Sequence, residues 1–195
     1  MKKLFAGFFL IVLAGASFVF ARAEDDNANN LDRFDYKVRQ IQLYNLLLPA
    51  LLTKDELHKI LPAIEKARQK VKDVHKTEVD LLKPLLGKVN DALKAAAERG
   101  AVPPKELVDQ IAVMRGKIAV GRYLFAQLNT QDVFDVVKKT VNAGQFKVIA
   151  NSLNPKDFDP KAKPDEMTQD EKVEMFVKEV LLNTEAYDLL VKMSM

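Results

Sequence analysis

The residues that could support acid–base or metal chemistry are few and far apart. His58 and His75 are the only imidazoles, and the chain has no cysteine. Both lie in one predicted helix, about 25 Å apart along its axis at about 1.5 Å per residue. They cannot share a metal ion, and neither has a second ligand at the spacing of a helical zinc motif. The sequence therefore predicts no metal site.

Nucleophiles and phosphate-binding loops give no stronger signal. After residue 23 the only serines are Ser152 and Ser194, and neither stands in a G-x-S-x-G context. The chain has no Walker-type or dinucleotide-binding glycine loop. Paired carboxylates such as Asp55-Glu56 and Asp170-Glu171 stand at predicted helix starts, where they favour the helix dipole. We expect no catalytic residue, no cofactor and no enzymatic activity.

One basic segment is a candidate contact surface. Arg68, Lys72 and Lys76 follow each other four residues apart, and Asp73 is the only acid between Lys66 and Lys76. Like charges at this spacing cost a few tenths of a kcal/mol per pair. The segment is either a solvated face, or one neutralised by the acidic C-terminal region, or a patch for acidic clients, lipid headgroups or phosphate-bearing polymers. Arg68, Lys72 and Lys76 are the predicted client-binding residues.

These side chains lie on one very long predicted helix. Thr53 and Glu56 have the spacing of a capping box, and Gly100 after Arg99 is a typical helix stop. Apolar residues recur between them at helical spacing. Unbroken, the helix would be about 69 Å long at about 1.5 Å per residue.

Two prolines lie inside this helix. Pro62 and Pro84 should each bend it, and both fall opposite the apolar stripe on a helical wheel. The apolar side would then be concave, either curving around its own core or forming a cradle that binds a partner. His75 and Glu78 interrupt the stripe and could pair, being three residues apart.

A second long helix should return antiparallel after a turn at residues 100–103. Its apolar residues follow a heptad seam: Leu107, Ile111, Met114, Ile118, Gly121, Phe125 and Leu128. Gly121 suggests close helix contact, or alternatively a ligand near the backbone. The seam could also pair between subunits.

The remaining segments are also predicted to be helical. A helix is expected over residues 31–48, another starting at the cap Thr130 with a break near Gly144, and a third capped by Thr168 and Glu171. Prolines make residues 154–166 a linker, and residues 167–195 would pack on the same domain as residues 31–153. Strand signals are weak, so we predict an all-α fold: a helical bundle or hairpin around one long, proline-bent central helix.

The N-terminus predicts export. Lys2 and Lys3 precede an apolar run, and Ala21-Arg22-Ala23 is typical of a cleavage site, so residues 1–23 read as a signal peptide. An uncleaved leader that anchors the chain is the alternative. Residues 24–30 are polar and predicted to be a disordered spacer. Without the leader the basic and acidic residues balance, which gives no reason to expect nucleic-acid binding.

Short motifs resemble one known family. Leu52-Thr53-Lys54-Asp55-Glu56 is similar to the L-T-x-x-Q motif of the Spy and CpxP group of periplasmic proteins, with Glu56 in place of the glutamine. Residues 128–132 and 167–171 match this motif less closely. The resemblance implies an all-helical, exported protein with a curved cradle, acting as an ATP-independent chaperone or stress regulator.

The resulting hypothesis is an exported, periplasmic or extracellular, non-catalytic binding protein of chaperone-like or stress-regulatory type. Its partners would be unfolded or envelope proteins held on a concave face, with no nucleic acid, and with the membrane only through an uncleaved leader. Two alternatives stay open: an oligomeric cell-envelope scaffold, and a carrier of an apolar ligand between the helices.

Overall fold

The computed structural model describes residues 26–195, and their side chains from Asp32 onward. The predicted signal peptide lies outside the described residues. The first helix, α1 (Asp26–Leu47), begins in a unit that ends at Tyr36 and continues into a second unit of residues 37–195. Five residues of the predicted spacer, 26–30, are helical here, since they include neither glycine nor proline and Asp26 at their start suits a helix N-terminus.

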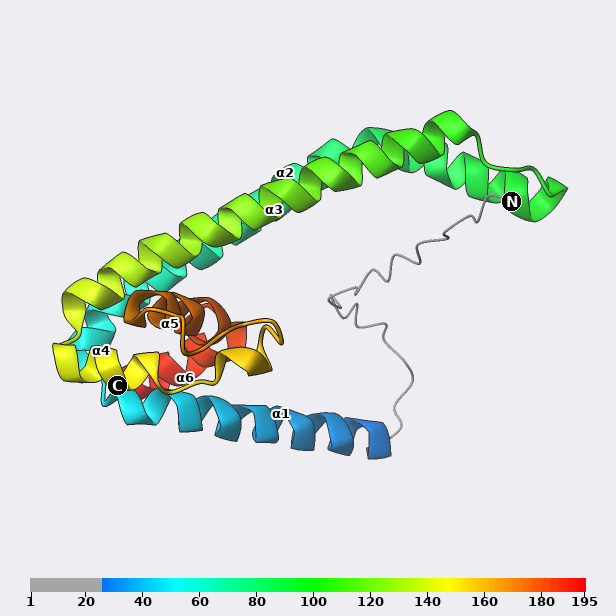
Figure 1. Ribbon diagram of the computed structural model, residues 1–195. Coiled ribbons are helices and arrows are strands. Elements are labelled where there is room, and N and C mark those ends of the chain that lie inside the picture. The colour runs from blue at the N-terminus through cyan, green and yellow to red at the C-terminus, as the bar shows by residue number, and fades with distance from the viewer. Residues whose placement is uncertain (1–25) are drawn as a thin grey trace, which may run out of the picture. The chain divides into compact units, whose positions relative to one another are not determined.

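Two long helices dominate residues 37–195. A short 3-10 turn (Leu48–Ala50) leads into α2 (Lys54–Arg99), and α3 (Lys105–Thr140) returns antiparallel beside it (Figure 1). The predicted caps of α2 are confirmed: Thr53 and Glu56 form a capping box, and Gly100 ends the helix in the left-handed region at φ 63°. Pro62 and Pro84 lie inside this continuous helix and are exposed, as predicted.

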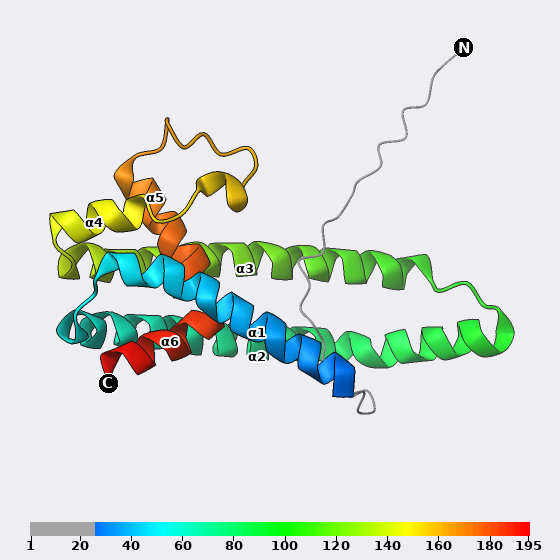
Figure 2. The ribbon, with the colours of Figure 1, turned by 90° about the horizontal axis from the view of Figure 1, so that it is seen from below.

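The shorter helices pack against one end of the α2–α3 pair. They are α4 (Ala143–Ala150), α5 (Gln169–Phe176), a π turn (Val177–Leu181) and α6 (Thr184–Ser194), with a 3-10 turn (Pro155–Asp157) before α5. Figure 2 shows them gathered where α2 begins and α3 ends. The described residues contain no strand, so the all-α prediction is confirmed.

The hydrophobic core lies at this end of the pair, called here the proximal end. Its fully buried side chains come from both long helices and from every shorter α-helix, and include Leu47, Leu57, Ile60, Ile64, Val133, Val137, Ile149, Val173, Phe176, Leu189 and Leu190. Burying such side chains contributes about 1.5–3 kcal/mol each. The proximal end therefore holds the unit together and anchors the long helices.

Two sequence expectations about α3 are wrong. Thr130 does not start a helix but lies inside α3, donating its hydroxyl to the Ala126 carbonyl at 2.9 Å. No Glu or Gln stands three residues after it to complete a capping box, so the helix continues to Thr140. Gly121 does not permit close helix contact, since a Cβ built there meets no atom within 4 Å.

Candidate functional site

The part of the hairpin beyond the core, residues 71–128, is the candidate functional site and is called the distal hairpin. Residues 71–128 belong to α2, α3 and the turn that joins them, and Figure 1 shows the two helices running on beyond the shorter helices α4 to α6. Many large apolar side chains are exposed on it: Val71, Val79, Leu81, Leu82, Leu86, Leu93, Val102, Val108, Val113, Val120, Tyr123, Leu124, Phe125 and Leu128. Exposed apolar side chains mark a binding face where they lie together, as Val79, Leu82 and Leu86 do in a groove along one side of the hairpin.

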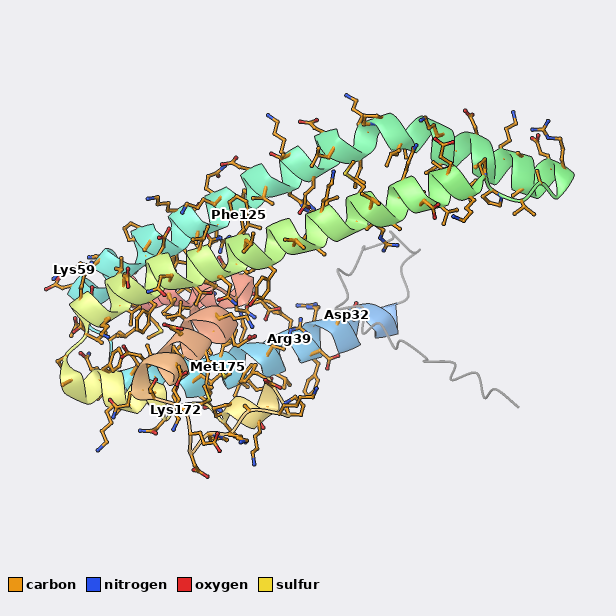
Figure 3. All side chains as sticks on the ribbon, turned by 45° about the horizontal axis from the view of Figure 1, so that its top comes forward. Asp32, Arg39, Lys59, Phe125, Lys172 and Met175 are labelled. Carbon is orange, nitrogen blue, oxygen red and sulfur yellow. The ribbon has the colours of Figure 1, made fainter. Side chains whose placement is uncertain are left out.

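Only the first part of the predicted heptad seam is shielded from solvent in the structure. Leu107 is buried and Ile111, Met114 and Ile118 are half-buried. Phe125 and Leu128 are instead 40% and 59% exposed, which corrects the prediction for the end of the seam. Beyond Gly121 the buried positions of α3 are Asn129, Thr130, Val133, Phe134 and Val137. Figure 3 labels Phe125 on the hairpin.

A groove runs along one side of the distal hairpin and is called the first groove. Its apolar lining residues are Val79, Leu82, Leu85, Leu86 and Val89 of α2 and Ile111 of α3. Its volume is about 720 Å³, within the usual range of ligand sites. Val79, Leu82, Leu86 and Leu93 recur at spacings that place them in one helical stripe.

A second groove differs from the first in its charges. It is lined by Leu85, Val113 and Met114 together with polar residues of the start of α3, and its volume is about 630 Å³. Lys105 there lies 2.8 Å from Asp109, so its cation is already paired. The adjacent Glu106 leaves this groove with an excess of negative charge.

A buried carboxylate joins the two helices at the base of the distal hairpin. Glu78 has an 8% exposed side chain and accepts two hydrogen bonds from Arg122, at 2.7 Å from Nε and 2.6 Å from Nη2. His75 Nδ1 lies 3.1 Å from Glu78 Oε2, so the predicted His75–Glu78 pair is confirmed. Arg122 was not predicted as its partner.

This cluster keeps Glu78 ionised. The hydrogen bonds from Arg122, together with its charge and the contact with His75, lower the pKa of Glu78 below its ordinary value although burial opposes this. The same pairing raises the pKa of Arg122. A bidentate pair of this kind gives a defined geometry, so the cluster fixes the register of α2 against α3.

The structure separates the three predicted client-binding residues. Arg68 is partly buried near the core: its guanidinium carbon lies 4.1 Å from the centre of the Tyr187 ring, and its Nε lies 3.6 Å from Glu65 Oε2. Lys72 and Lys76 are exposed on α2, and within the described residues neither forms an ion pair within 4 Å. Only these two remain open to an incoming partner.

A small cavity lies where the core meets the distal hairpin. Arg68, Asn129, Thr130 and Lys178 line it among apolar side chains, and its volume is about 180 Å³. Asn129 is 3% exposed and donates its amide to the Ala67 carbonyl at 3.3 Å. Its Oδ1 and the Nη1 of Arg68 are buried without a partner among the described residues.

No family model, curated protein or solved structure matches this chain. In the part of the chain that the structure describes, no cluster of three His, Asp or Glu side chains could hold a metal ion. None of its helices is apolar over enough length to cross a bilayer.

Proposed function

We propose that this chain is an exported, non-catalytic binding protein of chaperone-like or stress-regulatory type, which holds apolar segments of unfolded or envelope proteins on its distal hairpin. One observation carries the proposal: α2 and α3 extend beyond the core with large apolar side chains exposed. Leaving these side chains in water forgoes the free energy their burial would contribute, about 25 cal/mol per Å². Transient contact with a client would recover part of it.

Other features support this proposal. Thr53 and Glu56 of the L-T-x-x-Q-like motif cap the long helix that carries the apolar stripe. The exposed Lys72 and Lys76 lie on α2 just before Val79, the first residue of the first groove, where they would contact acidic client residues. The residue 1–23 leader would direct the protein out of the cytoplasm.

An aggregation assay tests the proposal. The purified exported protein should suppress the aggregation of reduced α-lactalbumin at stoichiometric amounts, and the double change Leu82→Ser and Leu86→Ser should weaken that effect severalfold. Leu48→Ser is the matched control, since Leu48 is similarly exposed but lies outside the hairpin. Absence of suppression at any salt concentration, or an equal loss with Leu48→Ser, would contradict the proposal.

The same exposed residues also fit the alternative of an oligomeric envelope scaffold. Leu107 is buried and Ile111, Met114 and Ile118 are half-buried on the helix that packs against α2, so subunits would have to meet through the outer faces instead. Light scattering separates the alternatives: a mass that stays monomeric over a hundredfold range of concentration removes the scaffold.

A further inference from the structure

We infer that the first groove binds a fatty acid, a single apolar chain that ends in a carboxylate. The groove follows α2 from Val79 to Val89, about 15 Å at about 1.5 Å per residue. An extended acyl chain of medium length fits such a track. This inference does not rest on client binding, because it assigns a small ligand to one groove of the hairpin.

The charges at the groove are complementary to an anion. Lys83 of α2 and Arg115 of α3 both line it and both are exposed. Within the described residues neither is in an ion pair within 4 Å, although Asp80 lines the same groove. The groove therefore carries one excess positive charge, and its two cations come from both helices.

The second groove provides an internal comparison. Its cation, Lys105, is already neutralised by Asp109, and Glu106 adds a negative charge. A carboxylate would be repelled there and attracted at Lys83 and Arg115. Charge thus distinguishes two grooves of similar size on the same pair of helices.

The apolar part of the lining suits an acyl chain. None of the residues lining the first groove is Asn, Gln, Ser or Thr. A hydrocarbon chain has no hydrogen-bonding groups that would need such partners, and its affinity grows with each methylene that the groove covers.

Displacement of the uncharged dye N-phenyl-1-naphthylamine tests the inference. Below their micelle concentrations, laurate should displace the dye at a concentration about tenfold lower than dodecyltrimethylammonium, which has the same chain length and the opposite charge. Lys83→Gln with Arg115→Gln should abolish that difference. Equal displacement by both amphiphiles, or a preference unchanged in the double variant, would overturn the inference.

Two further variants place the ligand in the first groove. Leu86→Asp should abolish laurate binding, whereas Leu124→Asp should leave it unchanged; these leucines are 59% and 54% exposed, and only Leu86 lines the groove. Circular dichroism verifies that both variants fold. An equal loss of laurate binding in both variants would overturn the inference. So would a protein that cosediments with phosphatidylglycerol vesicles while laurate does not displace the dye from it. If the protein suppresses aggregation but does not bind laurate, only this inference is contradicted. If it binds laurate but does not suppress aggregation, only the proposed function is contradicted.

Discussion

Arg122 of α3 clamps Glu78 of α2 through two hydrogen bonds, at 2.7 and 2.6 Å, across 44 residues of sequence. The two partners are unequally placed, since the carboxylate side chain is 8% exposed and the guanidinium side chain 57% exposed. The pair lies at the base of the distal hairpin, where the core ends. It therefore links α2 to α3 where the region that carries the grooves begins.

The unequal burial predicts unequal costs of mutation. Arg122→Met should lower the free energy of unfolding by about 2–3 kcal/mol, because it leaves a buried carboxylate without its main partner. Glu78→Leu should cost less than about 1 kcal/mol, since Arg122 can turn to water. Urea unfolding of both variants measures these two losses in unfolding free energy. Equal losses would contradict the prediction that the more buried partner is the more costly one to leave unpaired.

The pair also predicts a dependence on pH. The pKa of Glu78 is lowered on folding, so its contribution to stability is complete above the unfolded pKa. That contribution is lost as the pH falls through the still lower folded pKa. The difference in unfolding free energy between the native protein and Arg122→Met should have its largest value at pH 7 and should become smaller below about pH 4. A gap that stays constant from pH 7 to pH 3 would contradict this.

Glycines within α3 should be replaceable at a gain. A Cβ at Gly116 or Gly121 meets no atom within 4 Å, so alanine at each should raise the unfolding free energy by about 0.5–1 kcal/mol through helix propensity. Gly100→Ala is the opposite case, because φ 63° disfavours a side chain and should cost about 1 kcal/mol. Thermal unfolding compares the three, and a loss at Gly121 would restore the idea of close helix contact there.

Local signals in the sequence predicted the fold well. Thr53 with Glu56 and Thr168 with Glu171 form the expected capping boxes, because a cap depends on residues only three apart. Asn142 with Gln145 forms a third capping box that was not predicted, although the same spacing is present in the sequence. It begins α4 just after α3 ends.

Gln145 also links two of these helix starts, which predicts an unusually large effect of its removal. Its side-chain amide donates to Glu56 Oε2 at 2.9 Å and to the Leu51 carbonyl at 3.1 Å. Its Oε1 accepts a hydrogen bond from the backbone N–H of Asn142. Gln145→Ala should cost about 1–2 kcal/mol.

Gln131→Ala provides the control for that change. Gln131 is an exposed residue whose side chain bonds to Asp135, one turn later in the same helix, and to no other side chain among residues 32–195. Its removal should cost no more than about 0.5 kcal/mol. Chemical denaturation of the two variants tests the link, and similar costs would argue against it.

The candidate site was less accessible to sequence reasoning. Arg122 stands next to the seam residue Gly121, but nothing local states that Glu78, 44 positions earlier, is opposite it. The periodic pattern indicated where α2 is apolar but not where the core ends, because that depends on how far the short helices reach along the pair. Leu81, Leu82 and Leu93 belong to that apolar pattern and are nevertheless exposed.

Hydroxyl-radical footprinting tests the central claim most directly, because it reports which side chains a bound client covers. With reduced α-lactalbumin bound, the rate of oxidation should fall severalfold at Leu82, Leu86, Tyr123 and Phe125, while the exposed Phe158 outside the hairpin should not change. Unchanged oxidation along the distal hairpin, or protection confined to the proximal end, would contradict the account.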